Sequence, residues 1–229
     1  MEWMVERLKL AMSAAQLGFW DWDIKHQTLE WSPENERMFG YEPGTVTHSY
    51  ESWVQQLHPD DRDQTVAKVQ TALQNHQDFR IEYRICLANG TERWIEAHGH
   101  MIIDAQNQPT RMVGLVRDIS HRKKAIADLA SSESRFRAVF EQAAVGMARL
   151  APDGRWINVN QTLCNFLGYT RAELLELSFR DITDPADAAS DEQIYQDLVS
   201  GKIDTYRFEK RYLSKTGQSL WALVTVSNE

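Results

Sequence analysis

The sequence has few cysteines and no long apolar segment. Its two cysteines, Cys86 and Cys164, lie far apart, which fits neither a zinc knuckle nor a secreted disulfide framework, so we expect reduced thiols. The longest apolar runs, such as Met112–Val116, are much shorter than the ~20 residues that a membrane-spanning helix needs. The N-terminus also lacks a basic region followed by an apolar stretch. These absences predict a cytoplasmic protein without membrane insertion.

Basic residues are fewer than acidic ones, and the sequence lacks recognisable catalytic motifs. The 25 basic and 33 acidic residues give a net charge of −8, which repels nucleic-acid phosphates and anionic membranes. No glycine-rich loop that could cradle a nucleotide occurs in the sequence. His98 and His100 share one face of an expected strand, but no third ligand follows at a recognisable spacing, so we expect no metal site. The sequence therefore predicts a chain that is not an enzyme and does not bind nucleic acid.

What the sequence does contain is a repeat. The hydrophobic fraction of 42% and the charged fraction of 25% are typical of a globular protein with a packed core. Several short segments recur in the same order at a spacing of about 127 residues, far longer than a solenoid repeat. Phe39–Tyr41 is echoed by Leu167–Tyr169, Phe79–Arg84 by Tyr206–Arg211, and Trp94 by Trp221. The repeat predicts two domains, each with its own core.

The first copy alternates short strands and short helices. Strands are expected at residues 19–24, 27–31, 79–87, 92–103 and 110–118. Helices are expected after Ser32 and after His58, where Pro59 suits the first turn and the acids that follow suit the positive end of the helix dipole. Asn89-Gly90 is a hairpin turn. This order predicts an α+β fold with an antiparallel sheet flanked by short helices.

These residues resemble the PAS fold, in the variant whose C-terminal half is called the PAC motif. The matching residues are Gly18, Trp22, Asp23, Trp31, Ser32, Gly40, Tyr41, the run 58–62, Glu82, Tyr83, Arg84, Gly90, Arg93, Trp94, Gly114, Arg117, Asp118, Ile119, Ser120, Arg122 and Lys123. The resemblance covers residues 18–123 well and residues 135–229 partly. It implies two PAS folds joined by a connector helix.

The repeat and the resemblance together predict the domain organisation. We expect an N-terminal amphipathic helix at residues 1–16, a first PAS/PAC domain at 17–120, a connector helix at 121–134 and a second PAS domain at 135–229. Fewer residues follow Trp221 than follow Trp94 in the first copy. We therefore expect the second domain to lack its last strand.

The stretch between the domains has a heptad-like apolar pattern. The pattern comprises Ile119, Ile126, Leu129, Phe136 and Phe140. In the PAS family such a segment is typically a coiled-coil signalling helix, and its pairing implies a parallel homodimer. The alternative is a single amphipathic helix packed on its own domain. A second stripe, which could cover a sheet face or pair with a partner chain, comprises Val5, Leu8, Met12 and Ala15.

Strand alternation indicates a pocket in the first domain. Side chains alternate across a strand, so Ile81 and Tyr83 point to the core while Glu82 points away. Trp20 and Trp22 also share a face, where they either stack on a planar ligand or fill the space, and we favour filling. With the inward positions that the resemblance implies, the predicted ligand pocket comprises Trp20, Trp22, Phe39, Ile81, Tyr83, Ile85, Ile95, Ala97, Gly114 and Val116.

The outward face of the same sheet carries Trp94 and Leu115, which is unusual for a solvated surface. We expect the N-terminal stripe or a second protomer to cover it. The predicted signal relay comprises Asp118, Ile119, Ser120, Ile126 and Leu129. Within it, Asp118 or Ser120 can cap the start of the connector helix.

The resemblance implies a sensory and dimerisation module. Its output domain, the histidine kinase of a two-component system or a diguanylate cyclase, would lie outside this chain. The alternatives are a flavin- or haem-binding redox or light sensor and a ligand-free interaction scaffold. Cys164 precedes Gly168-Tyr169, the wrong side for the reactive cysteine of light-oxygen-voltage relatives, and helix entry explains His58 better than haem ligation does. The cofactor stays open, and the expected partners are a second copy and a small-molecule ligand.

Overall fold

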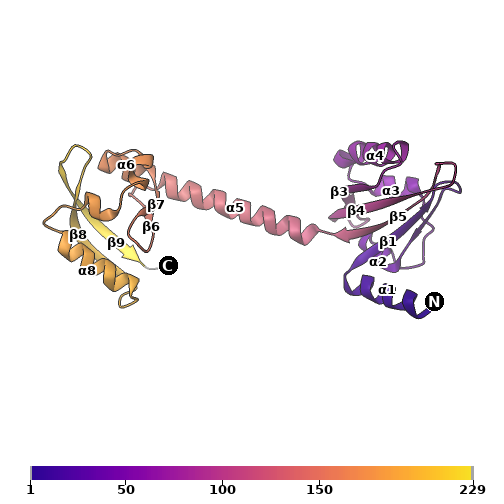
Figure 1. The fold of residues 1–229 in the computed structure, drawn as a ribbon, viewed down its shortest axis with the longest axis horizontal. Helices are drawn as coiled ribbons and strands as arrows, with labels where there is room; N and C mark the ends of the chain where they lie inside the picture. The colour runs from indigo at the N-terminus through magenta and orange to yellow at the C-terminus, as the bar shows by residue number, and fades with distance from the viewer. Residues whose placement is uncertain (1, 228–229) are drawn as a thin grey trace. The chain divides into compact units, whose positions relative to one another are not determined.

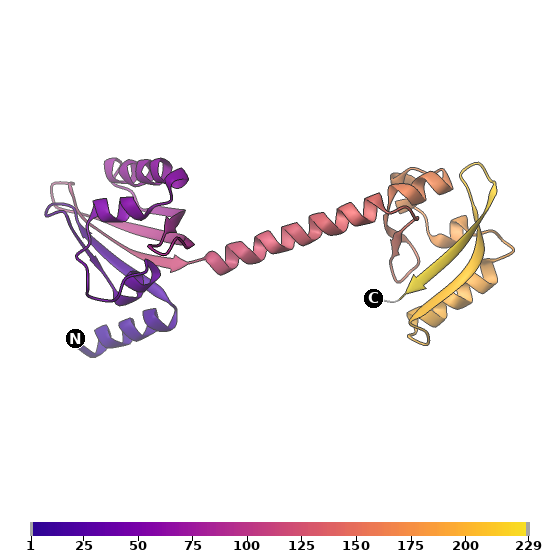
Figure 2. The same cartoon turned by 180° about the vertical axis from the view of Figure 1, so that it is seen from behind.

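The computed structural model describes residues 2–227, without the side chains of Glu2, Val5 and Leu8. The chain divides into two compact units, Met1–Asp128 and Leu129–Glu229, which are described separately. Each unit combines helices with antiparallel strands (Figures 1 and 2), so the fold is α+β as predicted. Two residues of the predicted N-terminal stripe, Val5 and Leu8, have side chains outside the described part of the structure.

The first unit is built around one five-stranded sheet. Its elements are α1 (Glu2–Ala14), β1 (Leu17–Asp23), β2 (Thr28–Trp31), α2 (Pro33–Met38), α3 (Tyr50–Gln56), α4 (Pro59–Gln74), β3 (Phe79–Cys86), β4 (Glu92–Ile103) and β5 (Pro109–Asp118). The strands lie in the order β2-β1-β5-β4-β3, and every neighbouring pair is antiparallel. Helices α3 and α4 lie together on one side of this sheet (Figures 1 and 2).

Local sequence signals account for where these elements begin and turn. The Ser32 hydroxyl accepts a hydrogen bond from the Asn35 amide, with Pro33 in the first turn of α2. The His58 imidazole accepts from the Asp60 amide at the start of α4, so His58 serves the helix entry. Gly90 has a positive φ of 81°, which a glycine adopts without strain in the β3–β4 turn.

The core of the first unit lies on the inward face of the sheet. Along β3, Ile81 and Tyr83 are buried whereas Glu82 is exposed, which is the alternation that the sequence predicts. The same face receives buried side chains from the helices, among them Phe39 and Val69. Burial of this apolar surface, at roughly 25 cal/mol per Å², is the main stabilising contribution to the unit.

The connector helix is longer than expected. Helix α5 runs from Ser120 to Gln142. It therefore continues past residue 135, at which the second domain was predicted to begin. Residues 135–142 contain no proline or glycine that would end a helix, and Phe136 stacks on Phe140 along it. The boundary predicted from the repeat therefore falls inside the helix.

The second unit also places helices between two strand pairs, but its strand pairs are separate. Its elements are β6 (Ala148–Leu150), β7 (Trp156–Val159), α6 (Gln161–Leu167), α7 (Arg171–Leu175), the 3-10 helix η1 (Phe179–Ile182), α8 (Ala188–Val199), β8 (Thr205–Leu213) and β9 (Ser219–Ser227). Among the described residues β6 pairs with β7 and β8 pairs with β9, with no strand joining the two pairs. That this domain lacks its last strand stays a prediction.

One polar arrangement recurs in both units and marks the repeat in three dimensions. The Asp61 carboxylate accepts the backbone amide and the guanidinium of Arg84, at 2.7–3.0 Å. Asp187 accepts the corresponding groups of Arg211 at 2.8–3.0 Å. The two guanidinium groups lie over Trp94 and Trp221, respectively. Each pair ties the start of a helix, α4 or α8, to the strand that follows it, β3 or β8.

The Asp187–Arg211 pair predicts a loss of stability in acid. Hydrogen bonds from Arg211 lower the pKa of the Asp187 carboxyl from 3.8 to about 2. A carboxyl whose pKa falls on folding stabilises the fold above its unfolded pKa and loses that contribution as the pH falls through its folded pKa. We expect the difference in unfolding free energy between the wild type and Asp187→Asn to shrink as the pH falls from 3.8 towards 2.

Urea unfolding followed through amide resonances of β8 measures this difference. Asp204→Asn is the matched control, because Asp204 is an exposed carboxylate of the same unit. Its difference from the wild type should stay nearly constant over the same pH range. A difference for Asp187→Asn that does not change between pH 4 and pH 2 would contradict the expectation.

Candidate functional site

The first unit encloses a small, strongly aromatic cavity. Its volume is about 50 Å³, and it lies between the inward face of the sheet and the helices. The lining residues are Trp20, Trp22, Leu29, Trp31, Asn35, Phe39, Tyr50, Trp53, Val69, Phe79, Ile81, Tyr83, Ala97, Met112 and Val116. A space of this size holds one or two waters or a few ligand atoms.

Seven of the ten predicted pocket residues line this cavity. These are Trp20, Trp22, Phe39, Ile81, Tyr83, Ala97 and Val116. Ile85 and Ile95 are fully buried but pack in the core outside the lining. Gly114 also lies outside it, because the Trp20 indole covers the position: a Cβ there would be 2.3 Å from Trp20 Cζ2. Whether any of these residues binds a ligand stays a prediction.

Aromatic rings stack on one another around the cavity. Trp20 stacks on Phe79 with 6.0 Å between ring centroids, and Trp22 on Tyr50 with 4.8 Å. The Trp53 indole donates a hydrogen bond to the Tyr83 hydroxyl at 3.1 Å, and burial raises the pKa of that hydroxyl. These rings occupy most of the pocket that the alternation of side chains along the strands predicted. Trp53 and Tyr50 were missed, because their helix gives no strand parity from which an inward direction could be inferred.

The start of α5 is hydrogen-bonded to β4. The Ser120 hydroxyl accepts from the Trp94 amide at 2.9 Å, and the Trp94 carbonyl accepts from the Ile119 amide at 2.9 Å. The Asp118 carboxylate accepts from the Ser120 amide at 2.8 Å and lies 3.8 Å from the Arg93 guanidinium. The three predicted relay residues at this position therefore join strand, turn and helix.

A cluster of charges fastens the first turn of α5 to the outward face of the sheet. Glu82 of β3 pairs with Arg122 and with Lys123, each at 2.7 Å, and these cations lower the pKa of its carboxyl, the Lys123 hydrogen bond most. Lys123 also lies over the Trp94 ring, at 4.5 Å. Within this chain Lys123 covers part of the half-buried Trp94, while Leu115 stays 38% exposed, and the cover expected from the N-terminal stripe or a second protomer stays a prediction. We call Glu82, Arg122, Lys123 and Trp94 the helix clamp.

The helix clamp lies directly behind the cavity. Glu82 is flanked in β3 by Ile81 and Tyr83, which line the cavity on the opposite face of the same strand. A displacement of β3 therefore moves the cavity wall and the Glu82 carboxylate together, since both belong to one stretch of backbone. The sequence showed Glu82 only as an outward strand residue, because its partners lie about 40 positions further along the chain.

The middle of the predicted heptad seam is exposed. Ile126 and Leu129 are 61% and 71% exposed, and Phe136 is exposed as well. At the two ends, Ile119 and Phe140 are buried. In the N-terminal stripe, Met12 is half-buried and Ala15 is exposed. The apolar side chains in the middle of the seam are therefore available to contact another surface. Their exposure to water is unfavourable, so such a contact would be stabilising.

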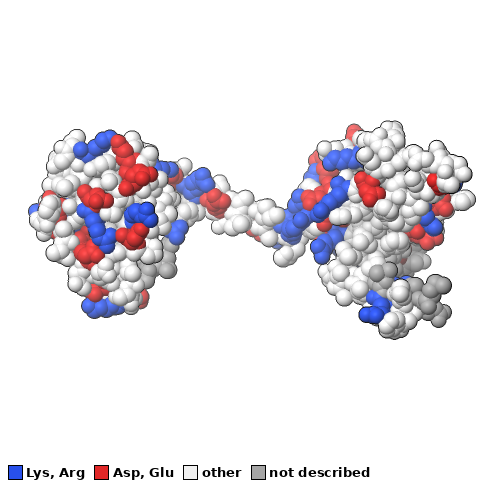
Figure 3. Space-filling view, viewed as in Figure 1, with Lys and Arg blue, Asp and Glu red and all other residues white. Residues whose placement is uncertain are grey.

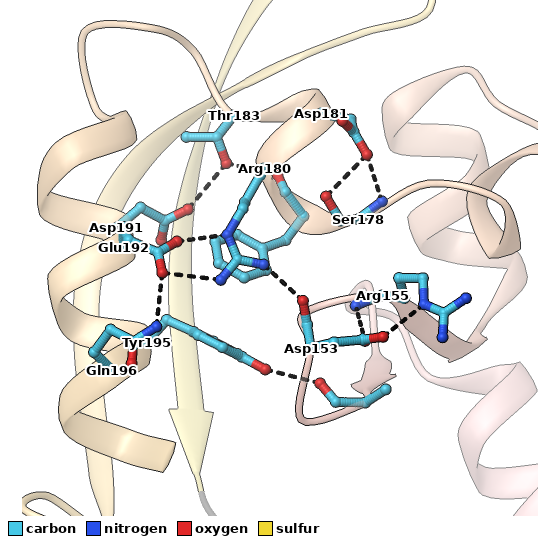
Figure 4. Close-up of polar contacts among 12 residues, drawn as sticks. Asp153, Arg155, Ser178, Arg180, Asp181, Thr183, Asp191, Glu192, Tyr195 and Gln196 are labelled. Carbon is cyan, nitrogen blue, oxygen red and sulfur yellow. Dashed lines mark hydrogen bonds and ion pairs between the residues drawn. The ribbon is translucent and has the colours of Figure 1, made fainter. Parts of the chain in front are cut away.

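The second unit contains a larger space, of about 380 Å³, which is lined by residues of β6, β7, α6, η1, α8, β8 and β9. Its lining includes Leu150, Trp156, Leu163, Phe179, Asp191, Tyr195, Phe208, Lys210, Tyr212 and Val224. Helix α8 forms one wall and is held in place by polar contacts (Figure 4). Arg180 donates to Glu192 at 2.6 and 2.9 Å and to the Asp153 carbonyl at 2.7 Å. The Tyr195 hydroxyl donates to the Ala151 carbonyl at 2.8 Å.

Elsewhere the surface offers little that would bind a metal or a polyanion. Within the described residues no three His, Cys, Asp or Glu side chains come together in a way that could hold a metal ion. His98 and His100 are exposed, and His100 pairs with Asp78 at 2.9 Å. On the face in Figure 3, basic and acidic side chains are interspersed on both units. No helix in the described part of the chain has both the length and the apolar character needed to cross a bilayer.

Comparisons with known proteins give a consistent result for both units. Residues 28–116 match the family described as PAS fold, and residues 144–228 match the one described as PAS domain. The chain is 43% identical over 99 residues to the protein named Probable diguanylate cyclase DgcE of Escherichia coli (strain K12), covering 43% of this chain and 9% of that protein. It is 29% identical over 125 residues to the blue-light-activated histidine kinase of Brucella anthropi, covering 55% and 25%.

A solved structure is similar as well. It is that of a sensory box histidine kinase/response regulator from Burkholderia thailandensis E264, with 31% sequence identity and a TM-score of 0.50. The match covers 57% of this chain and 98% of that chain. The chain spans no more than a quarter of the length of the two curated relatives.

Proposed function

We propose that this chain, which belongs to the PAS family in both of its units, is the sensory and dimerisation part of a signalling protein. Its PAS domains are homologous to the sensor domains of histidine kinases and diguanylate cyclases. The matched regions are sensor domains, and no catalytic domain is seen among them. In our proposal the first domain responds to a small ligand or cofactor, and α5 passes the response towards an output domain of one of these two kinds.

One observation carries this proposal. The helix clamp attaches the first turn of α5 to the strand that lines the cavity, through Glu82 between Ile81 and Tyr83. A ligand that displaces the cavity side of β3 would change the geometry of Glu82 and with it the position of Arg122 and Lys123. A relay needs such an element with two arrangements whose balance a ligand can shift.

The clamp predicts a measurable effect of Glu82→Gln. The substitution removes a carboxylate that neutralises two cations, so we expect roughly two- to fivefold faster hydrogen exchange of amides in the second turn of α5. The effect is modest because the ion pairs are partly solvated. Glu51→Gln, at an exposed glutamate of α3, is the matched control and should leave these amides unchanged. Equal exchange in both variants would mean that the clamp does not hold the helix.

We further propose that the chain forms a parallel homodimer through α5. The exposure of Ile126, Leu129 and Phe136 supports this, because a partner helix would remove three large apolar side chains from water. The seam positions follow one another at coiled-coil spacing along one helix. The parallel orientation is proposed because it places the same ends of both α5 helices together, so that both chains relay in the same direction.

The cavity of the first domain favours a small ligand, or none, over a flavin or a haem. Its walls are packed aromatic rings around about 50 Å³, far less than a large planar cofactor requires. Cys164 of the second domain is buried in α6, where burial raises the pKa of its thiol and so disfavours the reactive thiolate. The flavin or haem sensor stays the alternative, and an absorption spectrum of freshly purified protein distinguishes it. The free thiols of Cys86 and Cys164 support a reducing, cytoplasmic location.

A further inference from the structure

One fully buried side chain fastens the end of α5 to the second unit. Asn160 lies between β7 and α6 and has no contact with solvent. Its Nδ2 donates to the carbonyls of Phe140 and Val145, at 2.9 Å each. Its Oδ1 accepts from the amides of Met147 and Leu163, at 2.9 and 3.0 Å. A carboxamide has two N–H donors and an oxygen with two lone pairs, so Asn160 uses all of its hydrogen-bonding positions.

These bonds connect the end of one helix with the start of another. Phe140 belongs to the last turn of α5, where carbonyl groups have no amide partner within the helix. Leu163 belongs to the first turn of α6, where amides have no carbonyl partner, and Asn160 is the N-cap of that helix. One side chain therefore satisfies both helix ends. Neither end can move away from the other without leaving a buried polar group unpaired.

Two further contacts surround Asn160 and join the same elements. The Thr162 hydroxyl of α6 donates to the Ala143 carbonyl, just after α5, at 2.8 Å. Glu141 of α5 pairs with Arg171 of α7 at 2.5 Å. That ion pair is partly exposed, so it contributes little on its own. Asn160 is thus the buried centre of the attachment.

The repeat supplies a comparison within the same chain. Counted along the repeat, Ser32 stands where Asn160 stands, and α1 ends where α5 ends. The Ser32 hydroxyl accepts from the amides of Phe19 and Asn35, at 3.0 and 3.3 Å, which are the counterparts of the two amides that Asn160 holds. In the described part of the first unit, this hydroxyl donates to no carbonyl of α1. The acceptor role is therefore shared by both units, and the donor role belongs to Asn160.

The two incoming helices differ accordingly. Each side chain of α1 that the structure describes is exposed, except the half-buried Met12. Phe140, its counterpart in α5, is buried. The helix that enters the second unit is held at its end, whereas the helix that enters the first unit is not held in this way.

Helix α6 links this attachment to the core of the second unit. Leu163, Cys164 and Leu167 of α6 are buried in that core. Because Asn160 holds the end of α5 and the start of α6 together, a rotation or shift of α5 displaces α6 and these three side chains with it. A close-packed core transmits such a displacement rather than absorbing it.

We propose that Asn160 fixes α5 to the second domain and makes α6 the point at which a response carried by α5 enters that domain. This inference rests on the proposed relay for its purpose, but the attachment itself involves only residues of the second unit. Asn160 is a positioning residue in this account, since it acts through the two helix ends that it joins.

Asn160→Ser tests the proposal on the whole chain, because the first unit shows that a serine accepts both amide bonds at this position. Nitroxides at Ser131→Cys in α5 and Ala172→Cys in α7, both exposed, report the position of α5 on its own domain. The background carries Cys86→Ser and Cys164→Ala, and an excess of unlabelled chain restricts the measurement to distances within one chain. We expect one narrow distance with Asn160 and a distribution at least about twofold broader with serine, because α5 then pivots at its end.

Hydrogen exchange in the last turn of α5 gives a second readout. Asn160→Ser leaves the Phe140 and Val145 carbonyls without their donor. We therefore expect about tenfold faster exchange of the amides at the end of α5, roughly the value of one hydrogen bond. Asn165→Ser is the matched control, because it makes the same chemical change at an exposed position of α6. It should leave the distance distribution and the exchange unchanged.

Urea unfolding followed through amide resonances of β8 separates positioning from stability. A side chain that only stabilises the domain would lower the unfolding midpoint on removal without broadening the distance distribution of the folded chain. Asn160→Asp is the second variant if the serine variant does not fold, because it keeps the shape and the acceptor role of Asn160 and lacks the two donors. It should broaden the distribution in the same way.

Three results would overturn the proposal. They are a broad distance distribution in the chain with Asn160, an equally narrow one when Asn160 is replaced, and equal broadening by Asn165→Ser. The relay is measured separately at the first domain through Glu82→Gln. A failed attachment here therefore leaves the helix clamp and the proposed sensory function standing, and a failed clamp leaves this attachment standing.

Discussion

Replacing Ile126 and Leu129 with lysine should convert the chain from a dimer into a monomer. Both side chains lie exposed on α5, and a partner helix would bury them at seam positions. Two lysines per chain would place charge inside that seam, at a cost of several kcal/mol, on the order of what a buried unpaired charge costs. Light scattering or sedimentation over a range of concentrations measures the result directly.

The matched control changes the same helix away from the seam. Ala127→Lys with Ser131→Lys adds the same two charges at exposed positions of α5 outside the heptad pattern. That variant should remain a dimer. A monomeric wild type, or a dimer that survives both pairs of substitutions, would show that the seam does not associate.

Gly114→Ala should strongly destabilise the first domain and leave the stability of the second domain unchanged. A Cβ at this position would lie 2.0 Å from the His98 carbonyl oxygen and 2.3 Å from Trp20 Cζ2. The first of these atoms is backbone in the neighbouring strand, so it cannot move aside without breaking the pairing of β4 and β5. We expect a loss of roughly 3–5 kcal/mol, the range of severe overpacking and strain in a core.

Leu115→Ala is the control for this substitution, because Leu115 is the next residue of β5 and points to the opposite, partly exposed face. Its effect should stay below roughly 1 kcal/mol. Urea unfolding followed through amide resonances from both domains separates the two transitions. A first domain in Gly114→Ala that is as stable as in Leu115→Ala would contradict the packing described here.

The repeat and the strand alternation were the features that the sequence could predict. Inward positions such as Ile81 and Tyr83 are buried because alternation is a property of the backbone and needs no knowledge of partners. The end of α5 was missed because nothing near residue 134 marks a boundary and a helix continues until a residue stops it. Filling of the space by Trp20 and Trp22 was favoured, whereas their neighbours Tyr50 and Trp53 were missed, because the packing of rings from a helix is decided by rotamers.

Two polar features escaped prediction for different reasons. The helix clamp joins Glu82 to Arg122 and Lys123, and such pairings across the chain leave no local pattern. Lys210, which is buried and paired with Asp191, had a signal in contrast: the repeat aligns it with Tyr83, an inward position, where a lysine is rare unless it is paired. Strand parity in the second copy therefore marks Lys210 as an inward-facing lysine.

The most direct test of the central proposal is a distance between two labels in the dimer. A nitroxide at Asp128→Cys, in a chain with Cys86→Ser and Cys164→Ala, reports the separation of equivalent points on two α5 helices. Paired parallel helices should give one short, narrow distance, on the order of 20–30 Å including the labels, because packed helix axes lie about 8–10 Å apart.

Ala97→Val then asks whether the cavity communicates with the helix. Ala97 lines the cavity, and the two added methyl groups approach what about 50 Å³ can hold. If the cavity wall and the helix clamp move together, this substitution shifts or broadens the distance distribution at residue 128. A short distance with the same distribution with and without Ala97→Val would contradict a relay from the cavity to α5. The absence of any defined distance would contradict it as well.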